Sequence, residues 1–121
     1  MKPVSTYVRI NALLETDLQN ILRQEQQNEN RIFLYDVGEY WVAFEKSAYL
    51  LEQLAPREEK PVVLHMKQHP FPIVMHSSHH LRVKELCRRQ VFAQRGLDRL
   101  QFLTKPIEKS SYRRWYNQIC D

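Results

Sequence analysis

Residues 31–44, RIFLYDVGEYWVAF, determine which fold this chain can adopt. The stretch contains two short apolar and aromatic runs, RIFLYDV and EYWVAF, whose residue types are typical of buried strands. Gly38 lies between them, and glycine adopts turn conformations that a residue with a Cβ resists. The stretch therefore predicts a β-hairpin, or a sharp bend, centred on Gly38.

Patterns on either side of this hairpin predict helices and further strands. Apolar residues recur at helical spacing in residues 11–30, and a second helix over 45–55 is expected to end before Pro56. The remaining expected elements are strands at 61–67, 71–77 and 97–105, a helix over 77–95 that ends at Gly96, and a helix over 106–120. Because strands come in pairs between helices, this order predicts an α/β (α+β) fold: a mixed β-sheet of about five strands with helices packed on it.

The composition is typical of one soluble globular domain. The 121 residues are 43% apolar and 26% charged, and we treat residues 1–121 as a single domain. We find no apolar run of membrane-spanning length and no secretory h-region at the N-terminus. Cys87 and Cys120 are too few for a disulfide framework. We therefore expect reduced thiols in a cytoplasmic protein that has no membrane partner.

Positive charge is concentrated in the last third of the chain. Residues 81–121 hold ten Lys or Arg against four Asp or Glu, whereas residues 1–80 hold eight against ten. Surfaces that bind phosphate backbones or acidic partners show such an excess. Helices that simply face solvent often show it as well, so the charge alone leaves both interpretations open.

Sequence motifs of catalysis are not found. There is no nucleophile elbow, no Walker loop and no dinucleotide fingerprint, and two glycines cannot build a glycine-rich phosphate loop. Cys87 has basic neighbours that favour a thiolate, yet a packed or exposed thiol is the better interpretation. We therefore expect no enzyme, no cofactor and no small-molecule substrate.

All five histidines lie between His65 and His80. Histidine is the commonest metal ligand, so a zinc or nickel site has to be considered. The spacing fits neither an HExxH motif nor a paired CxxC motif, and carboxylate ligands are not obvious nearby. We favour a structural or surface role for these histidines over a metal site.

Tyr40 and Trp41 are adjacent in a predicted strand, so their side chains are expected on opposite faces of the sheet. One ring then belongs to the core, and the other is exposed or half-exposed. An exposed ring beside a turn can stack on a nucleic acid base. It can equally cover a sheet edge or contact a protein partner.

The stretch FLYDVGEYWVAFEKSA, residues 33–48, resembles the N-terminal mismatch-recognition domain (domain I) of the MutS DNA mismatch-repair family. The residues in register with that domain's motif are Gly38, Glu39, Tyr40, Trp41, Phe44 and Ala48, and Pro72 and His79 match a later motif. The resemblance covers about residues 30–90 and implies a mixed α/β domain that contacts DNA.

Departures from the family's motifs bear on function. Tyr40 matches the family's base-stacking Phe, but Val42 replaces the Glu that hydrogen-bonds the base. Met75 and Ser77 replace a Gly and a Pro of the later motif. We find no ATPase, clamp or lever domain in these residues, so the resemblance implies a reused scaffold rather than a mismatch-repair motor.

Two functional hypotheses remain. In the first, the chain is a non-catalytic module that binds DNA through an aromatic side chain, Tyr40 or Trp41, and a basic helix. The basic residues of that helix are Arg82, Lys84, Arg88, Arg89 and Arg95. In the second, the chain is a protein-interaction or structural module, or a homodimer, that uses residue types enriched at interface hot spots. These are Trp115, Tyr116 and Arg113 or Arg114.

Overall fold

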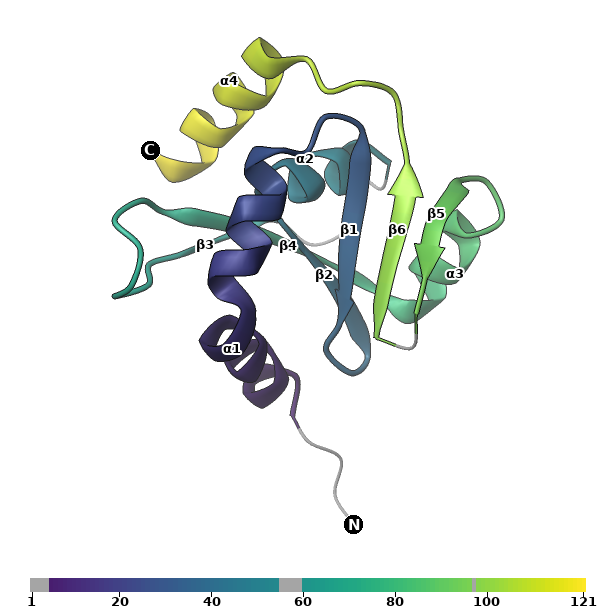
Figure 1. The fold of residues 1–121 in the computed structure, drawn as a ribbon, viewed down its shortest axis with the longest axis horizontal. Coiled ribbons are helices and arrows are strands. Elements are labelled where there is room, and N and C mark those ends of the chain that lie inside the picture. Colours follow the sequence, from purple (N-terminus) through teal and green to yellow (C-terminus); the bar gives the residue numbers. More distant parts are fainter. Residues whose placement is uncertain (1–4, 55–59, 97) are drawn as a thin grey trace.

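The structure of the protein, a computed structural model, describes residues 5–54, 60–96 and 98–121 (Figure 1). The elements in chain order are α1 (Thr6–Gln26), β1 (Arg31–Asp36), β2 (Tyr40–Phe44), α2 (Glu45–Leu54), β3 (Val62–Leu64), β4 (Ile73–His79), α3 (His80–Leu86), β5 (Val91–Arg95), β6 (Arg99–Leu103) and α4 (Lys109–Cys120). The predicted hairpin and the helices expected on either side of it are confirmed.

The described strands form one sheet in the order β3-β4-β2-β1-β6-β5. The predicted α+β class is confirmed, but the sheet is antiparallel at every pairing rather than mixed. Three of these pairs, β1–β2, β3–β4 and β5–β6, are formed by strands that follow each other directly along the chain. Such direct connections produce antiparallel pairs, because a parallel pair needs a long crossover.

The helix predicted over 77–95 is wrong, and its place is taken by a short helix and a strand. The helix α3 ends at Leu86, a turn follows, and β5 pairs with β6 as a sixth strand. Val91 and Phe92 are residue types that favour strands, and pairing with β6 satisfies their backbone groups. Gly96 lies in the β5–β6 turn, where its N–H donates to the carbonyl oxygen of Arg99 over 2.8 Å, and so does not end a helix.

Helices cover both faces of the sheet. In Figure 1, α1 crosses the front face, whereas α2 and α3 lie behind it. Alternation along the strands explains the two cores, because successive side chains point to opposite faces. Phe33, Val42 and Phe44 are buried on the α1 side, and Leu34 and Ala43 are buried on the side of α2, α3 and α4.

The turn at Gly38 closes the β1–β2 hairpin as the sequence predicts. Gly38 has a φ of 112°, and its N–H donates to Oδ1 of Asp36 over 2.9 Å. The Val37 N–H donates to the carbonyl oxygen of Tyr40 over 3.0 Å. The expected split of the aromatic pair is also confirmed, because Trp41 is buried in one core while Tyr40 is half-buried beside the other.

Candidate functional site

Tyr40 lies at the end of the sheet that carries the Gly38 turn. It pairs with His79 in the β2–β4 register, and the two rings meet edge to face with their centroids 5.5 Å apart. Arg9 of α1 covers the same turn, since its guanidinium lies 3.6 Å from the point where a Cβ on Gly38 would stand. Sequence reasoning missed Arg9, because only the tertiary fold brings the start of α1 to this turn.

Trp41 faces the opposite side of the sheet, in the core. Its side chain is 7% exposed, and the imidazole of His80 lies against its indole with ring centroids 5.2 Å apart. His80 is held by Asp36, whose Oδ1 lies 3.4 Å from Nε2. The Trp41 ring is therefore not accessible to a nucleic acid base. Of the two aromatic residues that the sequence offers for such a contact, Tyr40 stays a candidate.

The predicted basic residues do not share one helix, because α3 covers only residues 80–86. Arg82 and Lys84 lie on α3, and Arg82 forms an exposed ion pair with Glu85 over 3.2 Å. The side chain of His79 accepts a hydrogen bond from the N–H of Leu81 over 3.2 Å and so caps the start of this helix. The predicted basic helix that continues through Arg95 is therefore wrong.

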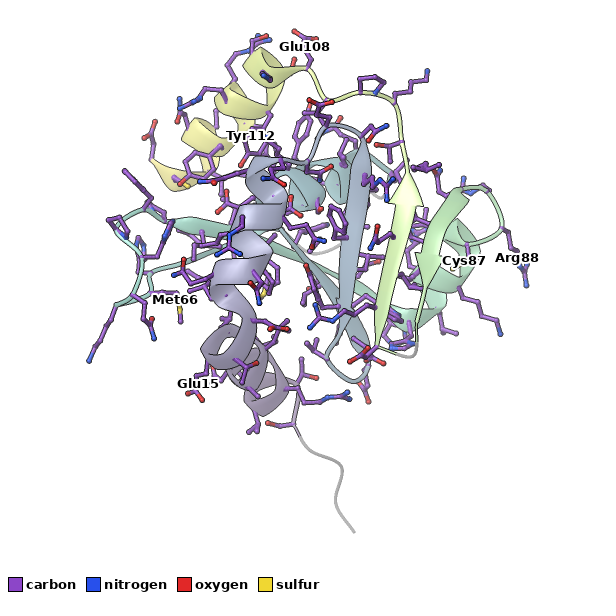
Figure 2. All side chains as sticks on the ribbon, viewed as in Figure 1. Glu15, Met66, Cys87, Arg88, Glu108 and Tyr112 are labelled. Carbon is purple, nitrogen blue, oxygen red and sulfur yellow. The ribbon has the colours of Figure 1, made fainter. Side chains whose placement is uncertain are left out.

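Arg88 and Arg89 lie in the turn that follows α3, and both are exposed. In Figure 2, Arg88 projects away from the body of the molecule. Arg95 ends β5, and its side chain lies outside the described part of the structure. In the described ranges, no ion pair joins Lys84, Arg88 or Arg89 to an acidic side chain.

We define the sheet-end surface as a set of exposed and half-buried residues beside the Gly38 turn, on α3 and in the turn that follows α3. Its hydrophobic member is Leu81, which is 70% exposed at the start of α3. Lys84 and Glu85 follow three and four positions after Leu81 on the same helix face, and Arg88 and Arg89 follow in the turn after the helix. The members are Arg9, Tyr40, His79, Leu81, Lys84, Arg88 and Arg89.

A second candidate site is a cleft of about 490 Å³ bounded by α1, α2, α4 and the loop before β4, which we call the α4 cleft. Two carboxyl groups and four aromatic rings are the notable parts of its lining, from Glu25, Glu45, His69, Phe71, Tyr112 and Tyr116. A volume of this size is within the range of small-molecule sites. Sequence reasoning missed this cleft, because its lining comes from segments far apart in the chain.

Glu45 lies where β2 continues directly into α2. Its φ of 52° is in the left-handed region, which is uncommon for a residue with a side chain. Oε2 of Glu45 accepts a hydrogen bond from the Tyr112 hydroxyl over 2.9 Å. Burial raises the pKa of Glu45 to about 7, although the hydrogen bonds from Tyr112 and from the Val74 backbone act in the opposite direction.

Glu25 is 2% exposed and anchors the start of α2 from the neighbouring helix α1. Its carboxylate accepts hydrogen bonds from the Ser47 backbone N–H over 2.8 Å and from the Ser47 hydroxyl over 2.6 Å. Ser47 Oγ in turn accepts from the buried N–H of Phe33 over 3.0 Å. Burial raises the pKa of Glu25 to about 7, and the hydrogen bonds from Ser47 and Asn28 oppose that rise.

The helix α4 packs onto α2 with its apolar face. Trp115 is 9% exposed, and its Nε1 donates to Oε2 of Glu52 over 3.2 Å. Its ring also meets the ring of Tyr49 edge to face. Trp115 is therefore a core residue of this chain, which corrects the expectation that it contacts a partner.

The histidines are dispersed by the fold. His76 is buried in β4, whereas His65 and His79 are exposed. Among residues 5–54, 60–96 and 98–121, no group of three or more His, Cys, Asp or Glu side chains could hold a metal ion.

In the part of the chain that the structure describes, no helix is both long enough and apolar enough to cross a membrane. Comparison with protein-family models, with curated proteins and with solved structures finds no match for this chain. The resemblance to MutS domain I rests on the sequence motifs alone and stays a prediction.

Proposed function

We propose that this protein is a non-catalytic module that binds DNA through the sheet-end surface. The observation that carries the proposal is the exposure of Lys84, Arg88 and Arg89 along α3 and the turn after it, in a segment that begins beside Tyr40, where His79 pairs with Tyr40. Cations without an acidic partner are free to replace the counterions of a phosphate backbone. The Tyr40 ring supplies a face on which a base can stack.

Such a surface recognises the backbone rather than the base sequence. Phosphate contacts position a protein on nucleic acid, whereas sequence is read by hydrogen bonds to base edges. Val42, which replaces the base-contacting Glu of MutS domain I, is fully buried. We therefore expect the protein to bind matched and mismatched duplexes with equal affinity, and to prefer single strands, whose bases are free to stack on Tyr40.

Fluorescence anisotropy with labelled single-stranded, duplex and mismatched DNA tests the proposal at low and at moderate salt. Contacts from three cations to a single strand predict a slope of about −2 for log affinity against log salt. The double variant Arg88→Glu/Arg89→Glu should abolish binding. The matched control Lys109→Glu/Arg114→Glu makes the same change of net charge on α4, and it should leave most of the affinity intact.

Equal losses in both double variants would mean that net charge, not this surface, attracts the DNA. Absence of binding at low salt would reject the proposal. A mismatch preference would instead mean that the protein shares the specificity of MutS domain I, through a residue other than Val42.

The alternative function, protein interaction or homodimerisation through α4, has fewer residues to offer than the sequence predicts, because Trp115 is buried within the chain. Arg113 and Arg114 are exposed on α4 and stay candidates for that role. Light scattering of the purified protein tests this alternative independently of DNA, since a dimer that Arg113→Glu/Arg114→Glu converts to a monomer would support it.

A further inference from the structure

The walls of the α4 cleft are joined by a continuous run of contacts. Tyr112 bonds to Glu45 at one end of the run, and the Tyr112 and Tyr116 rings are neighbours with centroids 6.2 Å apart. The Tyr116 hydroxyl donates to the carbonyl oxygen of Pro72, which connects α4 to the loop before β4. The cavity is thus bordered by aromatic side chains that come from α4 and from the loop before β4.

The loop before β4 completes the aromatic wall. Phe71 precedes Pro72 and is 65% exposed at the edge of the cleft. The ring of His69 meets it edge to face with centroids 5.9 Å apart. Together with Tyr112 and Tyr116, these rings give the cleft aromatic faces that a ligand with an apolar part can contact.

The charged groups that line the cleft are two carboxyl groups, Glu25 and Glu45, and two cations, Arg113 and Lys46. Both oxygens of Glu25 accept hydrogen bonds from Ser47 and Asn28, so Glu45 is the carboxyl group beside the aromatic rings. The side chain of Lys46 is turned to the end of α1. Its Nζ donates to the carbonyl oxygens of Gln26 and Asn28, over 3.2 and 3.3 Å, at the end of α1. The remaining cation of the lining, Arg113, is exposed.

We propose that the α4 cleft binds an organic ammonium group, primary or methylated, carried on a short apolar chain. Aromatic faces attract such cations through their quadrupole, and a carboxylate beside them adds a direct charge interaction. In this arrangement Glu45 neutralises the ammonium group, and the rings of Phe71 and Tyr116 surround its substituents. The ligand extends the function of the protein beyond the sequence-based expectation of no small-molecule partner, and it does not depend on DNA binding.

Affinity for the ammonium group should increase as the pH rises through about 7, since Glu45 and Glu25 ionise there. The charged and titratable groups that face Glu45 from the surrounding elements are Glu25, Lys46, His69, Tyr112, Arg113 and Tyr116. Histidine as a residue type also changes charge near this pH. The variant His69→Gln separates the two causes, because the increase should persist in it.

Titration of the protein with choline, followed by the amide signals in ¹H–¹⁵N NMR spectra, tests the proposal. Two probes of similar shape serve as controls: 3,3-dimethylbutan-1-ol, which is uncharged, and 3,3-dimethylbutyrate, which is an anion. Choline should move the amide signals of Glu45, Phe71 and Tyr112 at pH 8. Neither control compound should change these amide signals as much as choline does.

Variants locate the site. Phe71→Ala removes an exposed ring, so the fold is retained, and choline binding should weaken about two- to fivefold, as expected for loss of one cation–π contact. Glu45→Gln should weaken it further and remove most of the pH dependence. Leu81→Ala removes a similarly exposed side chain from α3 and should leave choline binding unchanged.

Three results would overturn the proposal. Equal binding of the uncharged alcohol would make the cleft an apolar pocket, and stronger binding of the carboxylate would make it an anion site. No signal changes at tens of millimolar choline would show that the cleft takes no ammonium ligand. If Glu45→Gln fails to fold, Phe71→Ala and the pH dependence still decide the question.

Discussion

The hydroxyl of Tyr112 donates a hydrogen bond to Oε2 of Glu45 over 2.9 Å, and this bond joins α4 to the residue at which β2 becomes α2. Glu45 takes a left-handed backbone conformation there, so the junction is strained, and the contact with α4 helps to hold it. The last helix of the chain thereby fixes the first turn of the second helix, and the α4 cleft lies beside the contact.

Loss of this hydrogen bond should destabilise the fold. At pH 8, where Glu45 is ionised, we expect Tyr112→Phe to lower the free energy of unfolding by about 1.5 to 3 kcal/mol, the range for a hydrogen bond to a charged group. Urea unfolding measures the change. Tyr49→Phe is the matched control, because no hydrogen bond from the Tyr49 hydroxyl is found within the described residues and the ring contacts remain. Equal losses in both variants would contradict the role of the bond.

Stability should fall as the pH rises from about 5 to 8. Burial raises the pKa of Glu25 from 4.5 to about 7, so the folded protein keeps a proton that the unfolded chain releases. The unfolded state then binds fewer protons over this range, and the free energy of unfolding decreases with pH. The contribution of Glu25 is up to about 3 kcal/mol. Urea midpoints at pH 5, 6, 7 and 8 measure the slope.

The variant Glu25→Gln identifies the group responsible. Its amide oxygen can still accept from the backbone N–H of Ser47, while the ionisable group is lost. The slope of stability against pH should become shallower, with the part due to Glu45 remaining. An unchanged slope would assign the pH dependence to other groups.

Replacement of Gly38 should cost stability through the backbone rather than through a clash. A Cβ at this position would meet Thr6 and Arg9 atoms at 3.5 and 3.6 Å, which are ordinary contacts, but the φ of 112° is strained for any residue with a side chain. We expect Gly38→Ala to destabilise by about 1 to 3 kcal/mol in thermal or urea unfolding. Gly96→Ala lies outside the left-handed region and should cost clearly less.

Trp115 should behave as a core residue. Trp115→Ala is expected to lower the free energy of unfolding by about 3 to 5 kcal/mol, because it removes a buried ring and leaves a cavity. The exposed control Leu81→Ala should stay within about 0.5 kcal/mol of the parent. Had α4 been a docking helix, Trp115→Ala would change the oligomeric state instead and leave the stability of the monomer intact.

Tyr40 should contribute to single-strand binding through its ring rather than through its hydroxyl. We expect Tyr40→Leu to weaken single-stranded DNA binding about tenfold, the order of one base–aromatic stack, and Tyr40→Phe to leave it unchanged. Anisotropy titrations at fixed salt compare the two. Equal affinities of all three proteins would remove Tyr40 from the proposed surface.

The sequence by itself determined the features that local rules control. The hairpin at Gly38 follows from one glycine between two apolar runs, and the opposite burial of Tyr40 and Trp41 follows from the period of a strand. The end of α2 before Pro56 is equally local, since proline cannot continue a helix. Each of these depends on neighbouring residues alone.

Only the tertiary structure decided the rest. Residues 91–95 join a strand and not a helix because β6 offers them a backbone partner, which no local pattern reveals. Burial of Trp115 against α2 likewise requires α4 to return across the molecule. The α4 cleft brings Glu45, Phe71 and Tyr112 together from three separate segments, and their proximity arises from chain packing rather than from spacing in the sequence.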